Sequence, residues 1–197
     1  MELSFTKDAV MVKSKRTDEG GYAMDWLTPF KDVTNEKDAL AKAVRNEKIA
    51  ECFIPGTEVF CMKDFSKVGT QIGEYCVTYV GKSFMKHFGS IEETNIPGIH
   101  LSVFQLQEWG LDSDVIRGLG GAEKIRSSYL YHMIEIIKLG KNGPGIFNGY
   151  TNLFYKQSPV DGKLWSPHFY LRGNRLGFGA LPANYDDGWE PGDQIYL

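Results

Sequence analysis

The sequence is poor in the residues that hold most metal sites. It contains three cysteines and four histidines among 197 residues, and no two cysteines form a Cys-x-x-Cys pair. These residues are Cys52, Cys61, Cys76, His87, His100, His132 and His168. Zinc sites in proteins use cysteines or histidines at close, regular spacings, so this scatter argues against a metal site. An odd set of unpaired cysteines also favours a reducing, intracellular environment.

A large excess of one charge and long apolar runs are also absent. The 22 Lys and Arg residues against 25 Asp and Glu residues give a net charge of −3, so the chain lacks the overall basic character of many nucleic-acid-binding domains. The most apolar short segment, residues 133–137, is interrupted by Glu135, and we expect no membrane span. Residues 1–5 carry no apolar signal core, so the sequence predicts a soluble cytoplasmic protein.

Motifs that bind cofactors or activate nucleophiles are missing as well. The chain has no His-Glu-x-x-His segment and no Gly-x-Ser-x-Gly nucleophile elbow. The glycine-rich segment 140–145 contains Lys141, but it follows an expected helix instead of preceding one. Its amides therefore do not form a phosphate cradle at a helix N-terminus, and we expect no cofactor.

Aromatic residues and glycines are plentiful, and they gather at the end of the chain. Aromatics make up 13% of the residues, and there are 22 glycines. Residues 147–197 alternate aromatic runs with turn residues, including Asp161-Gly162 and Gly173-Asn174, which favour tight hairpins. Gly177 and Gly179 flank Phe178 and indicate a bulge or a close approach by another backbone. This stretch predicts a C-terminal β-meander that ends in a closing strand at 194–197.

Earlier segments alternate between strand and helix patterns. Strands are expected at 8–13, 57–62, 73–81 and 99–106, a loop at 91–98, and helices at 35–51, 83–88, 112–119 and 122–139. The sum is a single α+β domain over 1–197. Its sheet would be mixed or antiparallel, with two main helices and the aromatic, glycine-rich meander forming a small barrel or sandwich. An N-terminal subregion, 1–55, with one strand and one helix, would pack on 56–197.

Two histidines lie on expected strands with a hydroxyl two residues later. His100 and Ser102 share one strand face, as do His168 and Tyr170. The His-Leu-Ser motif and the Pro-His-x-x-Leu-Arg stretch resemble the two His-x-Ser/Thr motifs of the 2H phosphoesterases. That resemblance implies a metal-free enzyme that cleaves or closes cyclic or 2′-5′ phosphodiester bonds, with one histidine as base and the other as acid. Tyr170 departs from the family pattern, which has Ser or Thr at that position.

The first interpretation is a non-catalytic binding or assembly protein that uses the aromatic β region as its contact surface. Trp and Tyr dominate contact energies in many interfaces, and Arg is common beside them. The binding residues expected on this basis are Trp165, Arg172, Arg175 and Trp189. The partner would be another protein or a second copy of the chain. The phosphoesterase is one alternative, and the other is a nucleic-acid-binding small barrel with Arg172, Arg175 and Lys163 beside stacking aromatics.

Overall fold

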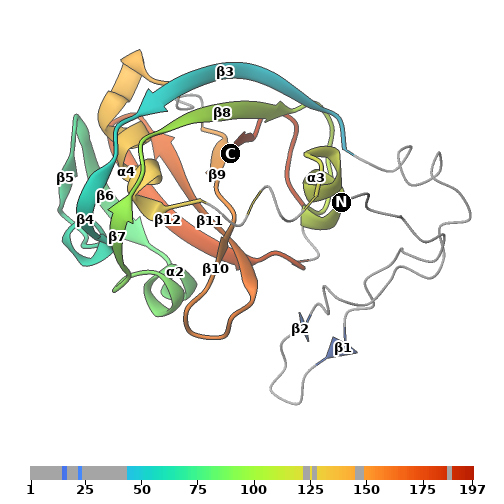
Figure 1. Ribbon diagram of the computed structural model, residues 1–197, viewed down its shortest axis with the longest axis horizontal. Coiled ribbons are helices and arrows are strands. Elements are labelled where there is room, and N and C mark those ends of the chain that lie inside the picture. The colour runs from blue at the N-terminus through green and yellow to red at the C-terminus, as the bar shows by residue number, and fades with distance from the viewer. Residues whose placement is uncertain are drawn as a thin grey trace, which may run out of the picture.

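The computed structural model describes residues 44–121, 125, 128–144, 149–185 and 188–197, together with the short paired strands β1 (Lys15–Arg16) and β2 (Tyr22–Ala23). These residues form a large mixed sheet with three α-helices, so the mixed α and β character is confirmed (Figure 1). The helices are α2 (Lys82–His87), α3 (Asp112–Gly118) and α4 (Leu130–Leu139), and 3-10 turns lie at Met62–Asp64 and Gly140–Asn142.

The sheet runs in the order β3-β8-β13-β9-β11-β12-β6-β5, with β10 pairing to β11 beside this path. The two ends of this order, β3 and β5, are not paired with each other, so the described strands form no closed barrel. Its strands are β3 (Asn46–Ile54), β5 (Gln71–Ile72), β6 (Tyr75–Val80), β8 (Ile99–Leu106), β9 (Thr151–Leu153), β10 (Lys156–Gln157), β11 (Leu164–Arg172), β12 (Arg175–Pro182) and β13 (Gln194–Tyr196). The β12–β6 and β13–β9 pairs are parallel, and the others are antiparallel.

A long two-stranded ribbon bends where it leaves this sheet. The β3–β8 ladder continues past Pro55-Gly56 and Pro97-Gly98 as the ladder of β4 (Thr57–Cys61) and β7 (Glu92–Ile96). The backbones approach so closely here that a Cβ on Gly56 would lie 2.5 Å from the Ile96 carbonyl oxygen. Glycine is therefore required at this corner, because a side chain would collide with backbone that has nowhere to move.

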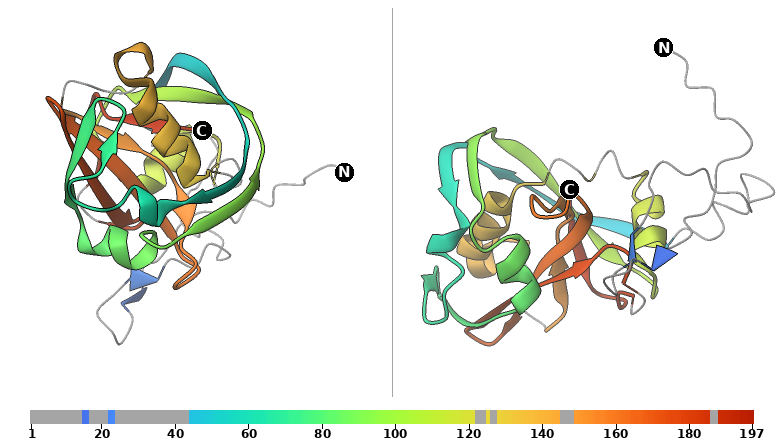
Figure 2. Two further views of the ribbon diagram at one scale, coloured as in Figure 1. Left: turned by 90° about the vertical axis from the view of Figure 1, so that its left-hand side faces the viewer. Right: turned by 90° about the horizontal axis from the view of Figure 1, so that it is seen from below.

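The two faces of the sheet carry separate cores. The inner face, which includes Val103, Phe169 and Phe178, packs against α4, and this helix lies in the hollow of the curved sheet (Figure 2). The outer face, which includes Leu153 and Ile195, packs against α3. At about 25 cal/mol per Å² of buried apolar surface, these two cores are the main source of stability. The outer core covers only part of the outer face of the sheet, and the candidate site lies on the part that it leaves uncovered.

Most expected elements of the described region are present, with three corrections. The helix expected at 35–51 is wrong over its second half, because residues 46–54 form strand β3; residues 35–43 and the strand expected at 8–13 lie outside the described residues. The loop expected at 91–98 contains strand β7. Of the helix expected at 122–139, α4 forms the part from Leu130, and Gly140 follows with a positive φ of 57°.

The C-terminal stretch is a meander only in part. The Gly173-Asn174 turn joins β11 and β12 as expected, and Asp161-Gly162 lies between β10 and β11. The closing strand β13, however, does not add to β12. It inserts between β8 and β9, because its neighbours are set by long-range packing and not by the chain order. The last strand thereby joins the β3–β8 pair to the rest of the sheet.

Candidate binding surface on the outer face of the sheet

The two histidines of the phosphoesterase hypothesis lie far apart on the sheet. From β11 through β9 and β13 to β8, the residues level with His168 are Leu153, Ile195 and Phe104. His100 lies four residues from Phe104 along β8. At about 4.8 Å per strand and about 3.3 Å per residue, this is roughly 14 Å across the sheet and 13 Å along it. The strand order therefore does not bring the two imidazoles to one phosphate group.

The surroundings of the two rings also differ. His100 is 70% exposed, with Nδ1 at 3.4 Å from Glu51 Oε1 and its ring at 5.2 Å from that of Phe53. His168 contacts the Trp189 ring edge-on at 5.5 Å, and its Nδ1 lies 3.0 Å from the Ser166 carbonyl oxygen. Burial lowers the pKa of His168 to about 4, so its ring is neutral near pH 7 and Nδ1–H donates to that carbonyl.

Both tryptophans of the expected binding set face the interior. Trp165 is 9% exposed and stacks on His87 with ring centroids 3.8 Å apart. Trp189 is 7% exposed, and its Nε1–H donates to Asp112 Oδ1 at 2.8 Å. Neither ring offers a free surface to a partner, and each instead has the structural role of holding a loop to the core.

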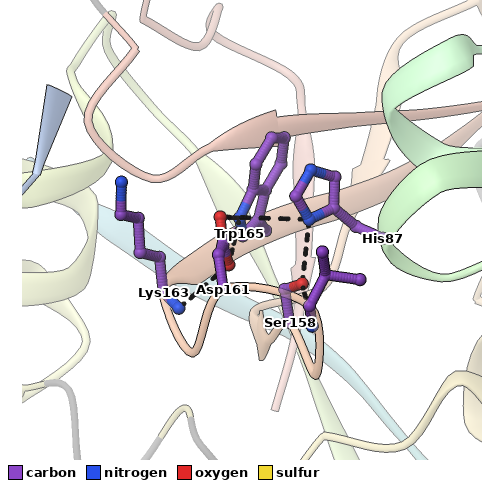
Figure 3. A network of polar contacts seen from close by, with 6 residues as sticks. His87, Ser158, Asp161, Lys163 and Trp165 are labelled. Carbon is purple, nitrogen blue, oxygen red and sulfur yellow. Dashed lines mark hydrogen bonds and ion pairs between the residues drawn. The ribbon is translucent and has the colours of Figure 1, made fainter. Parts of the chain in front are cut away.

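A His-Ser-Asp cluster that the sequence did not indicate surrounds Trp165 (Figure 3). His87 Nδ1 lies 2.8 Å from Ser158 Oγ and 4.0 Å from Asp161 Oδ2, while the indole N–H of Trp165 donates to both Asp161 oxygens at 3.3 Å. The composition is that of a catalytic triad, but the geometry differs. Both oxygens approach the same ring nitrogen, whereas in a triad they lie on opposite nitrogens.

Ser158 is also tied to its own loop. Its side-chain oxygen accepts the Val160 backbone N–H at 3.1 Å, and the residue is only 1% exposed. Burial lowers the pKa of His87 and so favours the neutral ring, whose Nδ1 shares a hydrogen bond with the Ser158 hydroxyl. The cluster therefore fastens the β10–β11 loop to the end of α2. No sequence spacing signals it, because His87 and Ser158 are 71 residues apart.

A second buried cluster fixes the start of α3. The Tyr155 hydroxyl and the Trp189 indole N–H both donate to Asp112 Oδ1, at 2.6 and 2.8 Å. Burial nevertheless raises the pKa of Asp112 to about 6, because two donors only partly replace the water that the carboxylate has lost. This cluster covers one end of the outer face and leaves the other end open.

The open end of the outer face presents two tyrosines around a glycine. Gly177 on β12 is level with Tyr170 on β11 and with Tyr79 on β6. The Tyr170 ring lies directly over Gly177, because a Cβ there would be 2.2 Å from Tyr170 Cζ. Tyr79 is 53% exposed. The expected bulge is also present, since the β12–β6 register shifts between Leu176 and Gly177.

Two arginines stand next to these rings. Arg172 and Arg175 are exposed and face each other directly across the hairpin that turns at Gly173-Asn174. Neither forms an ion pair with another residue of the described region. Burial raises the pKa of Tyr170 and Tyr79 adds to this rise, whereas the two guanidinium groups act against it. Tyr79, Tyr170, Arg172, Arg175 and Gly177 are together called the Tyr–Arg surface below.

The structure thus brings three expected site residues together and sets His168 against Trp189, while His100 and Ser102 lie on β8, away from both groups. Tyr170, Arg172 and Arg175 share the Tyr–Arg surface. Lys163 precedes β11 at the end opposite Arg172. Tyr79 was missed by sequence reasoning, because its parallel pairing with β12 spans about half of the chain.

Two further kinds of feature were sought in the described part of the chain. Searching those residues finds no cluster of three or more His, Cys, Asp or Glu side chains that could hold a metal ion. No helix among them is both long and apolar enough to cross a membrane. Comparisons with protein-family models, with curated proteins and with solved structures found no match to this chain.

Proposed function

We propose that this is a binding protein whose Tyr–Arg surface holds a ligand carrying both a planar ring and a phosphate group. Such a ligand is a free nucleotide or a nucleotide within a single strand of nucleic acid. The observation that carries the proposal is the arginine couple, Arg172 and Arg175, which forms no ion pair within the described region and lies next to an exposed aromatic platform. The proposal combines the expected aromatic contact surface with the expected nucleic-acid partner.

The arginine couple is unfavourable for the fold alone. Like charges directly opposite in an antiparallel pair destabilise it, by a few tenths to about 1 kcal/mol. Arg172 and Arg175 are held in this arrangement by a two-residue turn, and no described acidic side chain is paired with them. A bound phosphate would remove the repulsion, since guanidinium groups bind phosphate oxygens in a bidentate manner. A local arrangement that costs stability without a structural return is typical of functional sites.

The tyrosines supply the complementary half of the surface. Base stacking on an aromatic side chain contributes about 1–3 kcal/mol per base and tolerates any base. Gly177 lets the Tyr170 ring lie flat against the sheet, so little side-chain freedom remains to be lost on binding. Tyr79 extends the platform on the next strand.

Because the chain has a net charge of −3, we expect the affinity for such a ligand to depend only weakly on salt concentration. If two arginines contact phosphate, a plot of the logarithm of the affinity for a single strand against the logarithm of the salt concentration should have a slope of about −1.4. A protein that binds through a broad basic surface gives a much steeper slope. The phosphoesterase alternative has no comparable support, because it needs His100 and His168 at the same phosphate.

The test is fluorescence anisotropy with a labelled oligo-dT strand, its RNA counterpart and a duplex, followed by competition with free nucleotides. We expect single strands to bind at low salt, and competition by mononucleotide distinguishes a nucleotide site from a strand site. Arg175→Gln and Tyr170→Ala should each weaken binding at least tenfold. Arg45→Gln, at an exposed arginine immediately before β3 and far from β12 in the strand order, is the matched control and should leave binding unchanged.

Arg172→Glu separates a binding role from a structural one. It replaces two facing arginines by an opposite-charge pair, so the free energy of unfolding should rise by about 0.5 kcal/mol while ligand binding is lost. Absence of binding to every strand and nucleotide at low salt would refute the proposal. So would an Arg172→Glu variant that binds as the wild type does.

A further inference from the structure

We propose that two copies of this chain associate through the edge of β3 that faces away from β8, pairing antiparallel so that Lys48 of each copy lies opposite Glu51 of the other. This surface is separate from the Tyr–Arg surface, because β3 is at one end of the sheet order and β12 is near the other. The inference therefore stands independently of the proposed ligand.

The edge of β3 is long and carries apolar side chains. β3 contains nine residues and, within the described region, pairs with β8 alone. Such an edge offers a row of backbone N–H and C=O groups that another strand can use. Phe53 is 57% exposed and Ile49 is 43% exposed. Both would lose water contact if a further strand lay beside β3.

A bulge in β3 selects the register. The β3–β8 pairing shifts between Lys48 and Ala50, so Ile49 has no partner on β8. The side chains on the outer face are consequently Asn46 and Lys48 before the bulge, with Glu51 and Phe53 after it. In the dimer, each outer-face residue of β3 should lie opposite an outer-face residue of the other copy. Because the bulge changes the alternation, this requires the two-fold axis of the dimer to pass between Ile49 and Ala50.

That register is also favourable in charge. It places Lys48 opposite Glu51 at two symmetric positions and Asn46 opposite Phe53 at two more. Opposite charges that face each other across an antiparallel pair stabilise it. Lys48 and Glu51 already form an ion pair within each chain. In the dimer, the four charged side chains around the two-fold axis would therefore alternate between positive and negative.

Neighbouring registers lose this match. A shift by two residues in one direction sets Lys48 against Ile49 of the bulge, and the opposite shift sets Glu51 against the inward-facing Ala50. Charges and bulges are common devices that protect sheet edges from indiscriminate pairing. In β3 these devices disfavour other strands but complement a second copy of the same strand. A symmetric contact of this kind is the usual way in which homodimers form.

The experiment is sedimentation velocity on the full chain over a wide concentration range, with variants that alter the charges. We expect the wild type to show a concentration-dependent dimer, because a contact of one strand per chain is small. Lys48→Glu and Glu51→Lys should each weaken self-association at least tenfold, since like charges would then face each other. Circular dichroism checks that both variants keep the wild-type fold.

Restoring complementarity should restore association. An equimolar mixture of the Lys48→Glu and Glu51→Lys chains should form a heterodimer, and the double variant carrying both substitutions should self-associate as the wild type does. A wild type that stays monomeric up to its solubility limit would overturn the proposal. Equally decisive would be single variants that dimerise with unchanged affinity.

Discussion

Trp189 lies between two titratable groups whose effects on stability should oppose each other. On one side its indole N–H donates to Asp112, and on the other its ring contacts His168. Burial moves the pKa of both groups toward the neutral form, upward for the acid and downward for the base. We therefore predict that Asp112→Asn and His168→Gln change the pH dependence of unfolding in opposite directions.

For Asp112 the pKa rises from 3.8 to about 6 on folding. Between these two values the native protein keeps a proton that the unfolded chain releases, so stability falls as pH rises. A shift of about two units at 1.36 kcal/mol per unit corresponds to about 3 kcal/mol. Asp112→Asn removes this loss, because an amide oxygen still accepts from Tyr155 and Trp189 without carrying charge. Relative to the wild type, the variant should gain up to about 3 kcal/mol between pH 4 and pH 7.

For His168 the pKa falls from 6.5 to about 4 on folding. Between these values the unfolded chain binds a proton that the native protein does not, so stability is lost as pH falls from about 6.5 to about 4. The size is again about 3 kcal/mol by the same conversion. His168→Gln keeps a donor for the Ser166 carbonyl and does not titrate. Relative to the wild type, this variant should improve by that amount toward pH 4.

The assay is urea unfolding at half-unit steps from pH 4 to pH 8, followed by far-ultraviolet circular dichroism. Other titrating groups are the same in every protein, so they cancel when each variant is subtracted from the wild type. In the double variant the two differences should sum to a nearly flat profile. If the Asp112→Asn difference were constant within about 0.5 kcal/mol over this range, the buried-carboxylate argument would be refuted.

Three further substitutions test the packing. Glu93 accepts the N–H groups of Leu130 and Tyr131 at the start of α4 and pairs with Lys156 at 2.8 Å, so Glu93→Ala should cost about 3–5 kcal/mol in urea unfolding. His132 is fully buried, and neither ring nitrogen makes a hydrogen bond of ordinary geometry with the described residues. His132→Leu should therefore raise the thermal midpoint of unfolding, by an amount that corresponds to about 1–2 kcal/mol of added stability. Gly56→Ala should lower that midpoint by several degrees, whereas the same change at Gly81, where the nearest atom to a Cβ would be 3.4 Å away, should have a smaller effect.

Features decided by local chemistry could be predicted from the sequence. Strand β8 alternates apolar and polar residues from Ile99 to Val103, and Gly173-Asn174 is a two-residue turn between two aromatic runs. The short helices α2 and α3 also lie close to their expected bounds. In each case the residues that determine the structure are neighbours along the chain.

Strand β3 shows why local patterns fail elsewhere. Its Glu-Lys-Ile-Ala-Glu sequence is rich in good helix formers, and the bulge at Ile49 interrupts the alternation that would have indicated a strand. Its conformation is decided by pairing with β8, about 50 residues later. The separation of His100 from His168 is equally non-local, since it follows from the insertion of β13 and β9 between their strands.

The Tyr–Arg surface lies between these two cases. A two-residue turn at Gly173-Asn174 pairs the residues before and after it in mirror order, which makes Arg172 and Arg175 opposite each other and sets Tyr170 opposite Gly177. This pairing depends only on the position of the turn. Once the hairpin is predicted, the sequence itself places the two arginines opposite each other and the Tyr170 ring above Gly177. What the hairpin alone does not supply is Tyr79, because the parallel strand β6 reaches it from the first half of the chain. The hairpin of the proposed binding surface is thus encoded locally, while the second ring of its platform depends on the completed sheet.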